Sequence, residues 1–334
     1  MSKRRLTQQQ QQRIQQKHAE YKLRVEQNNQ NTSSDTQGEQ EGLVIAHYGS
    51  YVDVEAIDKT TIRCNLRQNL GGLVVGDQVI WQRVDVNNGI VVAVKSRTST
   101  LSRPTAPDKT KDIAANIDQV VIVIAAQPQP ATSLLDSYIA AVENNQMQPV
   151  IVFNKIDLLD ISNEQSSTQL LDIYRALNYP VFAVSATIGF GLADLQSQLQ
   201  NHISIFVGQS GVGKSSLLSK LIPDEEIAIG DANTSQVRGL HTTTTARLYH
   251  LPHGGDIIDS PGVREFMLWD MSPQSIAQGF IEFRPYIAQC RFRDCKHDHI
   301  AHCAVQQAAA SGAIDPSRME SYCRIITNIQ SNSK

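Results

Sequence analysis

The sequence predicts a three-part fold: a small β-barrel, a central α/β domain, and a mainly helical C-terminal segment. Three observations predict it. Short β-branched runs separated by turn residues fill residues 42–97, and longer apolar runs alternate with helical patterns over 98–270. From 271 to 334 the pattern is helical around a cluster of Cys and His. At roughly 150 residues per domain, 334 residues suffice for two or three domains.

Five short alternating runs build the predicted barrel. They are Leu43–Tyr48, Tyr51–Ile57, Thr60–Leu66, Gln78–Val84 and Ile90–Val94. Five strands in about 55 residues are typical of an OB-type barrel, and an SH3-like or purely structural barrel is the alternative. Tyr48, Tyr51 and Trp81 are the residues of this region that offer surface for stacking on a nucleic-acid base.

Residues 1–41 are rich in Gln, Asn, Ser and charge, so we expect a tail that is disordered or weakly helical. Residues 1–25 hold seven Lys or Arg against one Glu, within a chain of net charge −3. This basic segment is either a solvated tail or a contact for phosphate backbones. The start has no apolar signal region, and no run of about 18 apolar residues exists in the chain. We therefore expect a cytoplasmic protein without a membrane span.

A linker at Ser96–Pro107 is expected to lead into the α/β domain. The predicted strands are Gln119–Ala126, Pro149–Phe153, Val181–Val184, Ile203–Val207 and Asp256–Ile258. The predicted helices are Leu134–Glu143, Leu192–Leu199 and Ser215–Leu221. Alternating helices and continuously apolar strands are typical of a doubly wound parallel sheet.

The segment after Ile203–Val207 fits the phosphate-loop pattern G-x-x-x-x-G-K-[ST]. Its residues are Gly208, Gln209, Ser210, Gly211, Val212, Gly213, Lys214 and Ser215, with Ser216 next. Because of the glycines, backbone N–H groups can converge on phosphate oxygens at a helix N-terminus. We expect Lys214 to pair with the β- and γ-phosphates and to act in catalysis, and Ser215 to ligate Mg²⁺.

A base-recognition motif directly follows the apolar run Val150–Phe153. Its residues are Asn154, Lys155, Ile156 and Asp157. The carboxylate of Asp157 can accept from both N1–H and N2–H₂ of guanine, whereas adenine offers no such pair. Asn154 is expected to tie the loop to neighbouring backbone, and the Lys155 stem to lie over the base. Ser185 and Ala186 follow the next strand and predict a second base-contacting loop. GTP is therefore expected, and an ATP-dependent kinase is rejected on Asp157.

The remaining nucleotide contacts are predicted near residue 259. Asp259 is expected to hold Mg²⁺ through water, and the Gly262 N–H to sense the γ-phosphate. Within Thr242–Thr245 we assign the catalytic switch threonine, and with it Mg²⁺, to Thr243. Many GTPases orient the attacking water with a Gln directly after the Asp motif, but Val263 stands there. His241 is the candidate for orienting the water, and an exposed loop histidine is the alternative interpretation.

A metal site is predicted near the C-terminus. Its ligands would be Cys290, Cys295, His297 and Cys303. Three thiolates and one imidazole suit a closed tetrahedral Zn²⁺ site with a structural role. By position, His299 and His302 are rival ligands. The surrounding basic residues are compatible with RNA contact or with an ordinary charged surface: Arg284, Arg291, Arg293 and Lys296.

The motif order is circularly permuted, since the base motifs at 154 and 185 precede the phosphate loop at 208. With the barrel and the metal motif, this order resembles the RsgA (YjeQ) family of small-ribosomal-subunit biogenesis GTPases over about residues 42–310. The family pattern C-x₄-C-x-H-x₅-C implies His297 as the fourth zinc ligand. The resemblance also implies GTP hydrolysis stimulated by the small ribosomal subunit.

The partners implied are the small ribosomal subunit with its rRNA, and GTP or GDP. We expect a monomer that promotes late subunit maturation and is released when GTP is hydrolysed. The alternative is a GTP-dependent RNA-binding module without significant turnover, against which Lys214, Ser215 and Asp259 argue. We further hypothesise that γ-phosphate contacts at Gly262 are transmitted along Val263–Pro273 to the C-terminal domain.

Overall fold

The computed structural model describes residues 38–67, 70–106, 109–222, 246–260, 271–298 and 302–332. Its strands are β1 (Glu39–His47), β2 (Tyr51–Ala56), β3 (Thr61–Leu66), β4 (Gln78–Arg83), β5 (Asn88–Val94), β6 (Thr100–Ala106), β7 (Lys109–Ala115), β8 (Gln119–Ala125), β9 (Gln148–Asn154), β10 (Val181–Ala183), β11 (Ile203–Val207), β12 (Arg247–His250) and β13 (Asp256–Asp259). Its helices are α2 (Thr132–Asn144), η1 (Ile156–Leu158), α3 (Ile161–Ala176), α4 (Leu192–Leu199), α5 (Lys214–Leu221), α6 (Pro273–Gly279), η3 (Ile281–Phe283), α7 (Arg284–Ile287), α8 (Ala304–Ala310) and α9 (Pro316–Asn332).

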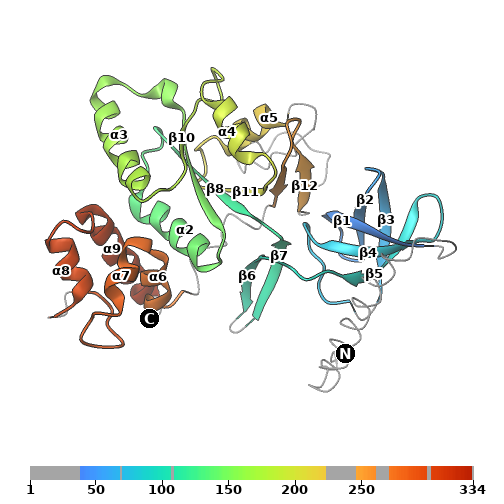
Figure 1. Cartoon of the computed structure of the whole chain (residues 1–334). Helices are drawn as coiled ribbons and strands as arrows, with labels where there is room; N and C mark the ends of the chain where they lie inside the picture. The colour runs from blue at the N-terminus through green and yellow to red at the C-terminus, as the bar shows by residue number, and fades with distance from the viewer. Residues whose placement is uncertain are drawn as a thin grey trace.

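One sheet runs through the barrel and the α/β domain (Figure 1). Its strand order is β10-β9-β8-β11-β13-β12-β1-β2-β3-β5-β4. Pairing of β1 with β4 closes the last five strands into the barrel, and β1 meets β12 at Ala46 and Arg247. The predicted OB-like barrel is therefore confirmed.

The barrel core is apolar because alternate residues of each strand face inward, as in Val52 and Val54 of β2. Trp81 belongs to this core: it is fully buried, and its Nε1 donates to the Glu41 carbonyl at 3.3 Å. The prediction that Trp81 offers a stacking surface is wrong, because β4 turns the indole inward. Tyr48 and Tyr51 stack on each other with ring centroids 4.7 Å apart, and Tyr48 is 40% exposed.

The α/β domain is doubly wound, as predicted. Strands β10, β9, β8, β11 and β13 are parallel, and β12 adds an antiparallel strand beside β13. All seven residues of β8 are buried, which explains its continuous apolar run. One apolar cluster packs α2 and α3 on one face of the sheet, and another packs α4 and α5 on the other.

The segment between barrel and α/β domain differs from the predicted linker. Thr100–Ala106 is strand β6, which pairs with β7 in a separate two-stranded sheet (Figure 1). Arg97 fastens it: Nε and Nη2 donate to buried Asp77 at 2.7 and 2.9 Å, and Nη1 donates to Asp112 at 2.6 Å. Polar residues in both strands hide the hairpin from a hydrophobicity pattern. The barrel also begins at Glu39, ahead of the predicted boundary at 42.

The C-terminal helices pack around an aromatic cluster of Phe280, Phe283 and Tyr322. The apolar core there also includes Ala140 of α2, so the helical region lies directly against the α/β domain. The Cβ that a side chain would add at Gly279 lies 2.5 Å from the Ala140 Cα, and this close approach of α6 to α2 requires glycine. No helix within the described ranges is long and apolar enough to cross a membrane.

Candidate nucleotide and metal sites

Four predicted motifs meet at one edge of the parallel sheet. Asn154 ends β9, Ser185 follows β10, Gly208 follows β11 and Asp259 ends β13. Because these strands are parallel, their carboxyl ends lie on the same side, which is where ligands bind in α/β folds. Motifs more than 100 residues apart in the chain (154 to 259) thus share one edge.

The phosphate loop is held close to the sheet by glycine. At Gly208, with φ +140°, a Cβ would lie 2.2 Å from the Val123 carbonyl oxygen. At Gly213, with φ +90°, it would lie 2.4 Å from Nδ2 of Asn154. Both positions therefore exclude side chains, and the loop wraps tightly at the start of α5.

Lys214 lies over this loop. Its Nζ donates to the carbonyl oxygens of Gly208 at 2.8 Å and Gln209 at 2.6 Å. The ammonium group and the backbone N–H groups at the α5 N-terminus give the loop positive potential. That arrangement suits a chain of phosphates.

The base motif and the phosphate loop are connected by side-chain hydrogen bonds. Asn154 is buried; its Nδ2 donates to the Val212 carbonyl at 2.9 Å, and its Oδ1 accepts from the Ala186 N–H at 3.3 Å. The Lys155 Nζ donates to the carbonyl oxygens of Gly211 at 2.6 Å and Gln127 at 2.9 Å. Sequence reasoning missed Gln127, although it comes two residues after the end of strand β8, at the same sheet edge.

Asp157 lies outside the hydrogen bonds that connect the base motif to the phosphate loop. It is exposed, and its Oδ1 accepts a hydrogen bond from the Ser185 hydroxyl. Ser185 in turn is fully buried, and its Oγ accepts from the Ile188 N–H at 3.3 Å. The hydroxyl therefore orients a carboxylate that still has acceptor positions open for a base with two adjacent N–H donors.

The structure describes part of the predicted magnesium site. Ser215 lies in the first turn of α5, and Asp259 ends β13 next to buried Ser260. The hydroxyl and carboxylate oxygens of Ser215 and Asp259 are the ligand type that Mg²⁺ prefers. His241, Thr243, Gly262 and Val263 lie outside the described residues, so their roles stay predictions.

Cys290, Cys295, His297 and Cys303 form one cluster, with their ligand atoms within 4.8 Å of one another. The His297 Nδ1 lies 3.3 Å from the Cys303 Sγ and 3.6 Å from the Cys290 Sγ, and the two sulfurs are 3.8 Å apart. Sulfurs about 3.8 Å apart match a tetrahedron with Zn–S bonds of about 2.3 Å. The residues therefore fit a Cys₃His zinc site. His302 is exposed, and His299 lies outside the described residues.

The protonation of this cluster is set by burial. Burial raises the pKa of the Cys303 thiol to about 12 and lowers the pKa of the His297 imidazole. A divalent cation that binds here has to displace thiol protons, so its affinity falls with acidity. Nearby, Arg291, Arg293 and Lys296 are exposed.

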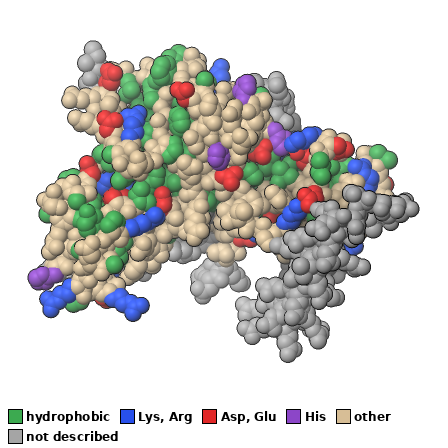
Figure 2. All heavy atoms as spheres, in the orientation of Figure 1, with side chains coloured by type: hydrophobic (Ala, Val, Ile, Leu, Met, Phe, Trp, Pro, Cys, Tyr) green, Lys and Arg blue, Asp and Glu red, His purple; other side chains and the backbone are tan. Residues whose placement is uncertain are grey.

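Figure 2 shows Lys and Arg side chains close together at this end of the molecule. Arg284, expected among the basic residues of this surface, instead donates from Nη2 to Glu143 of α2 at 2.8 Å.

The phosphate loop and a base motif of the guanine-binding type lie on one edge of the sheet, in permuted order. A barrel precedes them in the chain and a Cys₃His cluster follows them. Together these features define a circularly permuted GTPase. The RsgA GTPase family model matches residues 94–269. The chain belongs to the RsgA GTPase family, and it is a GTPase.

Similar proteins extend the match beyond that domain. The small ribosomal subunit biogenesis GTPase RsgA of Pseudomonas aeruginosa strain LESB58 is 46% identical, over 98% of both chains. The relative of the same name in Pseudomonas putida strain F1 is 46% identical over 100% of both. The crystal structure of YjeQ from Thermotoga maritima has a TM-score of 0.74 and 32% identity, covering 87% of this chain and 99% of that one. YloQ, a circularly permuted GTPase, has a TM-score of 0.71 and 28% identity, covering 90% and 99%.

Proposed function

We propose that this chain promotes late maturation of the small ribosomal subunit, binds its rRNA, and leaves the subunit when GTP is hydrolysed. The observation that carries the proposal is the full-length match, since the relatives named for small ribosomal subunit biogenesis align from barrel to metal cluster. The exposed Arg291, Arg293 and Lys296, and the Tyr48–Tyr51 pair on the barrel, supply chemistry that suits phosphates and unstacked bases.

In this proposal Lys214 leaves the loop carbonyls for the β- and γ-phosphates, and Asp157 reads the guanine edge. Ser215, Thr243 and Asp259 would hold Mg²⁺, which neutralises charge on the phosphates. His241 would orient the attacking water because Val263 has no polar group, and the Gly262 N–H would meet the γ-phosphate. Zn²⁺ would hold the loop from Cys290 to Cys303 together. The protein would work as a monomer in the cytoplasm.

The test is GTP turnover with and without purified small ribosomal subunits. We expect slow intrinsic hydrolysis that accelerates at least tenfold with subunits, since a partner has to order the switch residues. The variant His241→Ala should lose most of that acceleration, while His253→Ala, at an exposed turn, should keep it. Equal turnover with and without subunits would reject the proposal, and full turnover in His241→Ala would remove that residue from the mechanism.

Release is tested separately by sedimentation. The protein should co-sediment with small subunits in the presence of a non-hydrolysable GTP analogue and remain in the supernatant with GDP. Equal binding in both states would contradict release on hydrolysis.

A further inference from the structure

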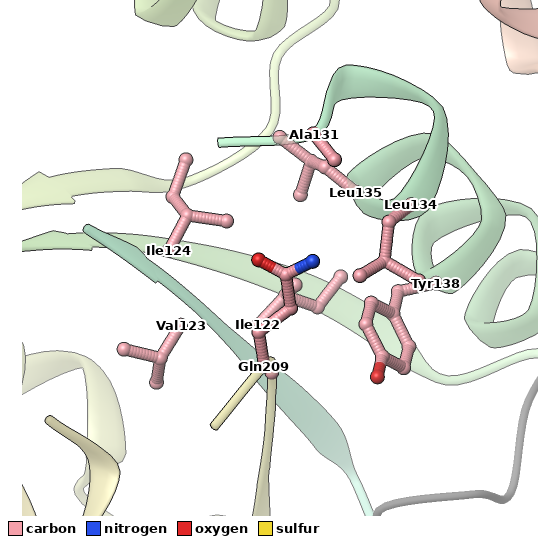
Figure 3. A pocket seen from close by; sticks show the side chains of 9 residues that line it. Ile122, Val123, Ile124, Ala131, Leu134, Leu135, Tyr138 and Gln209 are labelled. Atoms are coloured by element: carbon pink, nitrogen blue, oxygen red, sulfur yellow. The ribbon is translucent and has the colours of Figure 1, made fainter. Parts of the chain in front are cut away.

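The first turns of helix α2 lie close to the phosphate loop. A small cavity of about 10 Å³ separates its first turns from Gly208 and Gln209. Apart from these two loop residues, apolar side chains line it, among them Ile124 of β8 and Leu135 and Tyr138 of α2. Figure 3 shows the Gln209 side chain pointing toward α2, beside Ile124 and Leu135. Gln209 and the first turns of α2 therefore line the same small cavity.

The same helix is bound to the C-terminal region by buried charge. Asp136 of α2 accepts from Nη1 of Arg318 on α9, and both side chains are at most 2% exposed. The Arg318 Nε donates to Glu282 at 2.7 Å, and its guanidinium lies 4.3 Å from the centre of the Phe280 ring. Tyr174 of α3 donates to the Asp136 Oδ1 at 2.7 Å.

Contacts continue to the last turn of α2. The Asn144 Nδ2 donates to the Ser275 carbonyl of α6 at 2.7 Å, and Glu143 pairs with Arg284. Gly279 of α6 packs on Ala140. Buried, fully paired charges and close backbone contact oppose movement of α2 relative to the C-terminal helices. We therefore expect α2 and these helices to move together as one rigid body.

We infer that Gln209 and helix α2 couple the phosphate loop to the zinc-bearing C-terminal region. Lys214 supplies the two states that such coupling needs. Its ammonium donates hydrogen bonds to the carbonyls of Gly208 and Gln209. Phosphates compete for the same ammonium, so binding releases the Gln209 carbonyl and lets its side chain shift in the α2 cavity. The inference depends on nucleotide binding and not on the proposed ribosomal role.

Backbone amide hydrogen exchange on the full-length, zinc-loaded protein tests this coupling. It compares nucleotide-free protein with protein saturated with a non-hydrolysable GTP analogue. In the wild type we expect exchange in α2 and α9 to change at least twofold. In Gln209→Ala, compared at nucleotide concentrations that saturate the variant, the change in α9 should fall below half its wild-type size. Gln209→Met, which fills the same space, should restore it, and the exposed-site control Gln200→Ala should match the wild type.

A second variant breaks the far end of the connection outside the nucleotide site. Glu143→Gln combined with Asn144→Ala should keep the response of α2 and reduce that of α6 and α7, which these two side chains contact. A wild-type α9 that ignores nucleotide would overturn the inference. So would a full α9 response in Gln209→Ala together with a full α6 response in the double variant, which would instead favour a route through Val263–Pro273.

Discussion

Arg318 of α9 donates to Asp136 of α2 in an ion pair that is almost completely buried and joins the α/β domain to the C-terminal helices. Arg318→Met removes the cation that pairs with both Asp136 and Glu282, and leaves Asp136 with the Tyr174 hydroxyl as its donor. Uncompensated buried charge costs about 3–5 kcal/mol in the free energy of unfolding. Arg324→Met, on the same helix, removes an exposed pair with Glu320 and should cost at most about 0.5 kcal/mol. Denaturant unfolding measures both, and equal midpoints would contradict the role of the buried pair.

His250 should make the contact between barrel and α/β domain dependent on pH. Its Nε2 lies 2.6 Å from Glu55 of β2 and its Nδ1 lies 2.6 Å from Asp256 of β13. The hydrogen bond to Asp256, then that to Glu55, raises the pKa of His250 despite its partial burial. A raised pKa means stabilisation that is complete below about pH 6.5, the unfolded value, and is lost as pH rises through the folded value.

The difference in unfolding free energy between wild type and His250→Gln should therefore shrink between pH 6 and pH 9, a range that begins below the ordinary His pKa of about 6.5. Thermal or urea unfolding across this range measures it. His253→Gln, at the neighbouring exposed turn, is the control. A difference that grows with pH would show that the imidazolium is not the stabilising form.

Asp157→Asn should change the base that the site prefers. The amide oxygen can still accept from N1–H, but the NH₂ group faces the guanine N2 amino group, donor against donor. We expect GTP affinity to fall by about 100-fold or more, and xanthosine triphosphate, which has an acceptor at that position, to bind better than GTP. Competition against a fluorescent nucleotide measures this. Asp194→Asn, at an exposed residue of α4, should leave the preference unchanged. Retained GTP preference in Asp157→Asn would exclude the carboxylate as the group that recognises the base.

Gly208→Ala should disrupt the phosphate loop through one contact. The new Cβ would lie 2.2 Å from the Val123 carbonyl, so strand β8 or the loop has to move. Gly254→Ala is the matched control, because φ is also positive at +92° but nothing lies within 4 Å of its Cβ. We expect Gly208→Ala to lose about 1–3 kcal/mol more stability than the control, and to bind nucleotide more weakly in calorimetry. Equal losses would mean that backbone strain alone matters.

Cys290→Ser should remove zinc and loosen the C-terminal helices, because three ligands hold a structural Zn²⁺ far less tightly than four. Metal analysis of the purified protein should show the loss, and added chelator should no longer change its melting temperature. Cys323→Ser alters a thiol of α9 outside the cluster and should retain one zinc per chain. Full zinc content in Cys290→Ser would favour a different ligand set.

The primary structure was enough to predict the class of this protein. Phosphate and base motifs depend on residue type and short spacing. Gly208–Ser215, Asn154–Asp157 and the cysteine spacing from 290 to 303 can therefore be recognised from the sequence alone. Most strands of the α/β domain also follow from hydrophobic runs, because β8 and β11 lie in the middle of the sheet. Helix α3 and strand β12 were not predicted.

Long-range contacts decided the rest. The Trp81 indole turned inward, since side-chain direction depends on partners far away in the chain. The hairpin β6–β7 pairs neighbouring strands where a linker was expected, and its polar residues concealed it. The pairing of Arg318 with Asp136 spans 182 residues, and His250 reaches Glu55 across 195. No local pattern marks such pairs, because what makes each of them strong is the burial and geometry that the folded chain alone supplies.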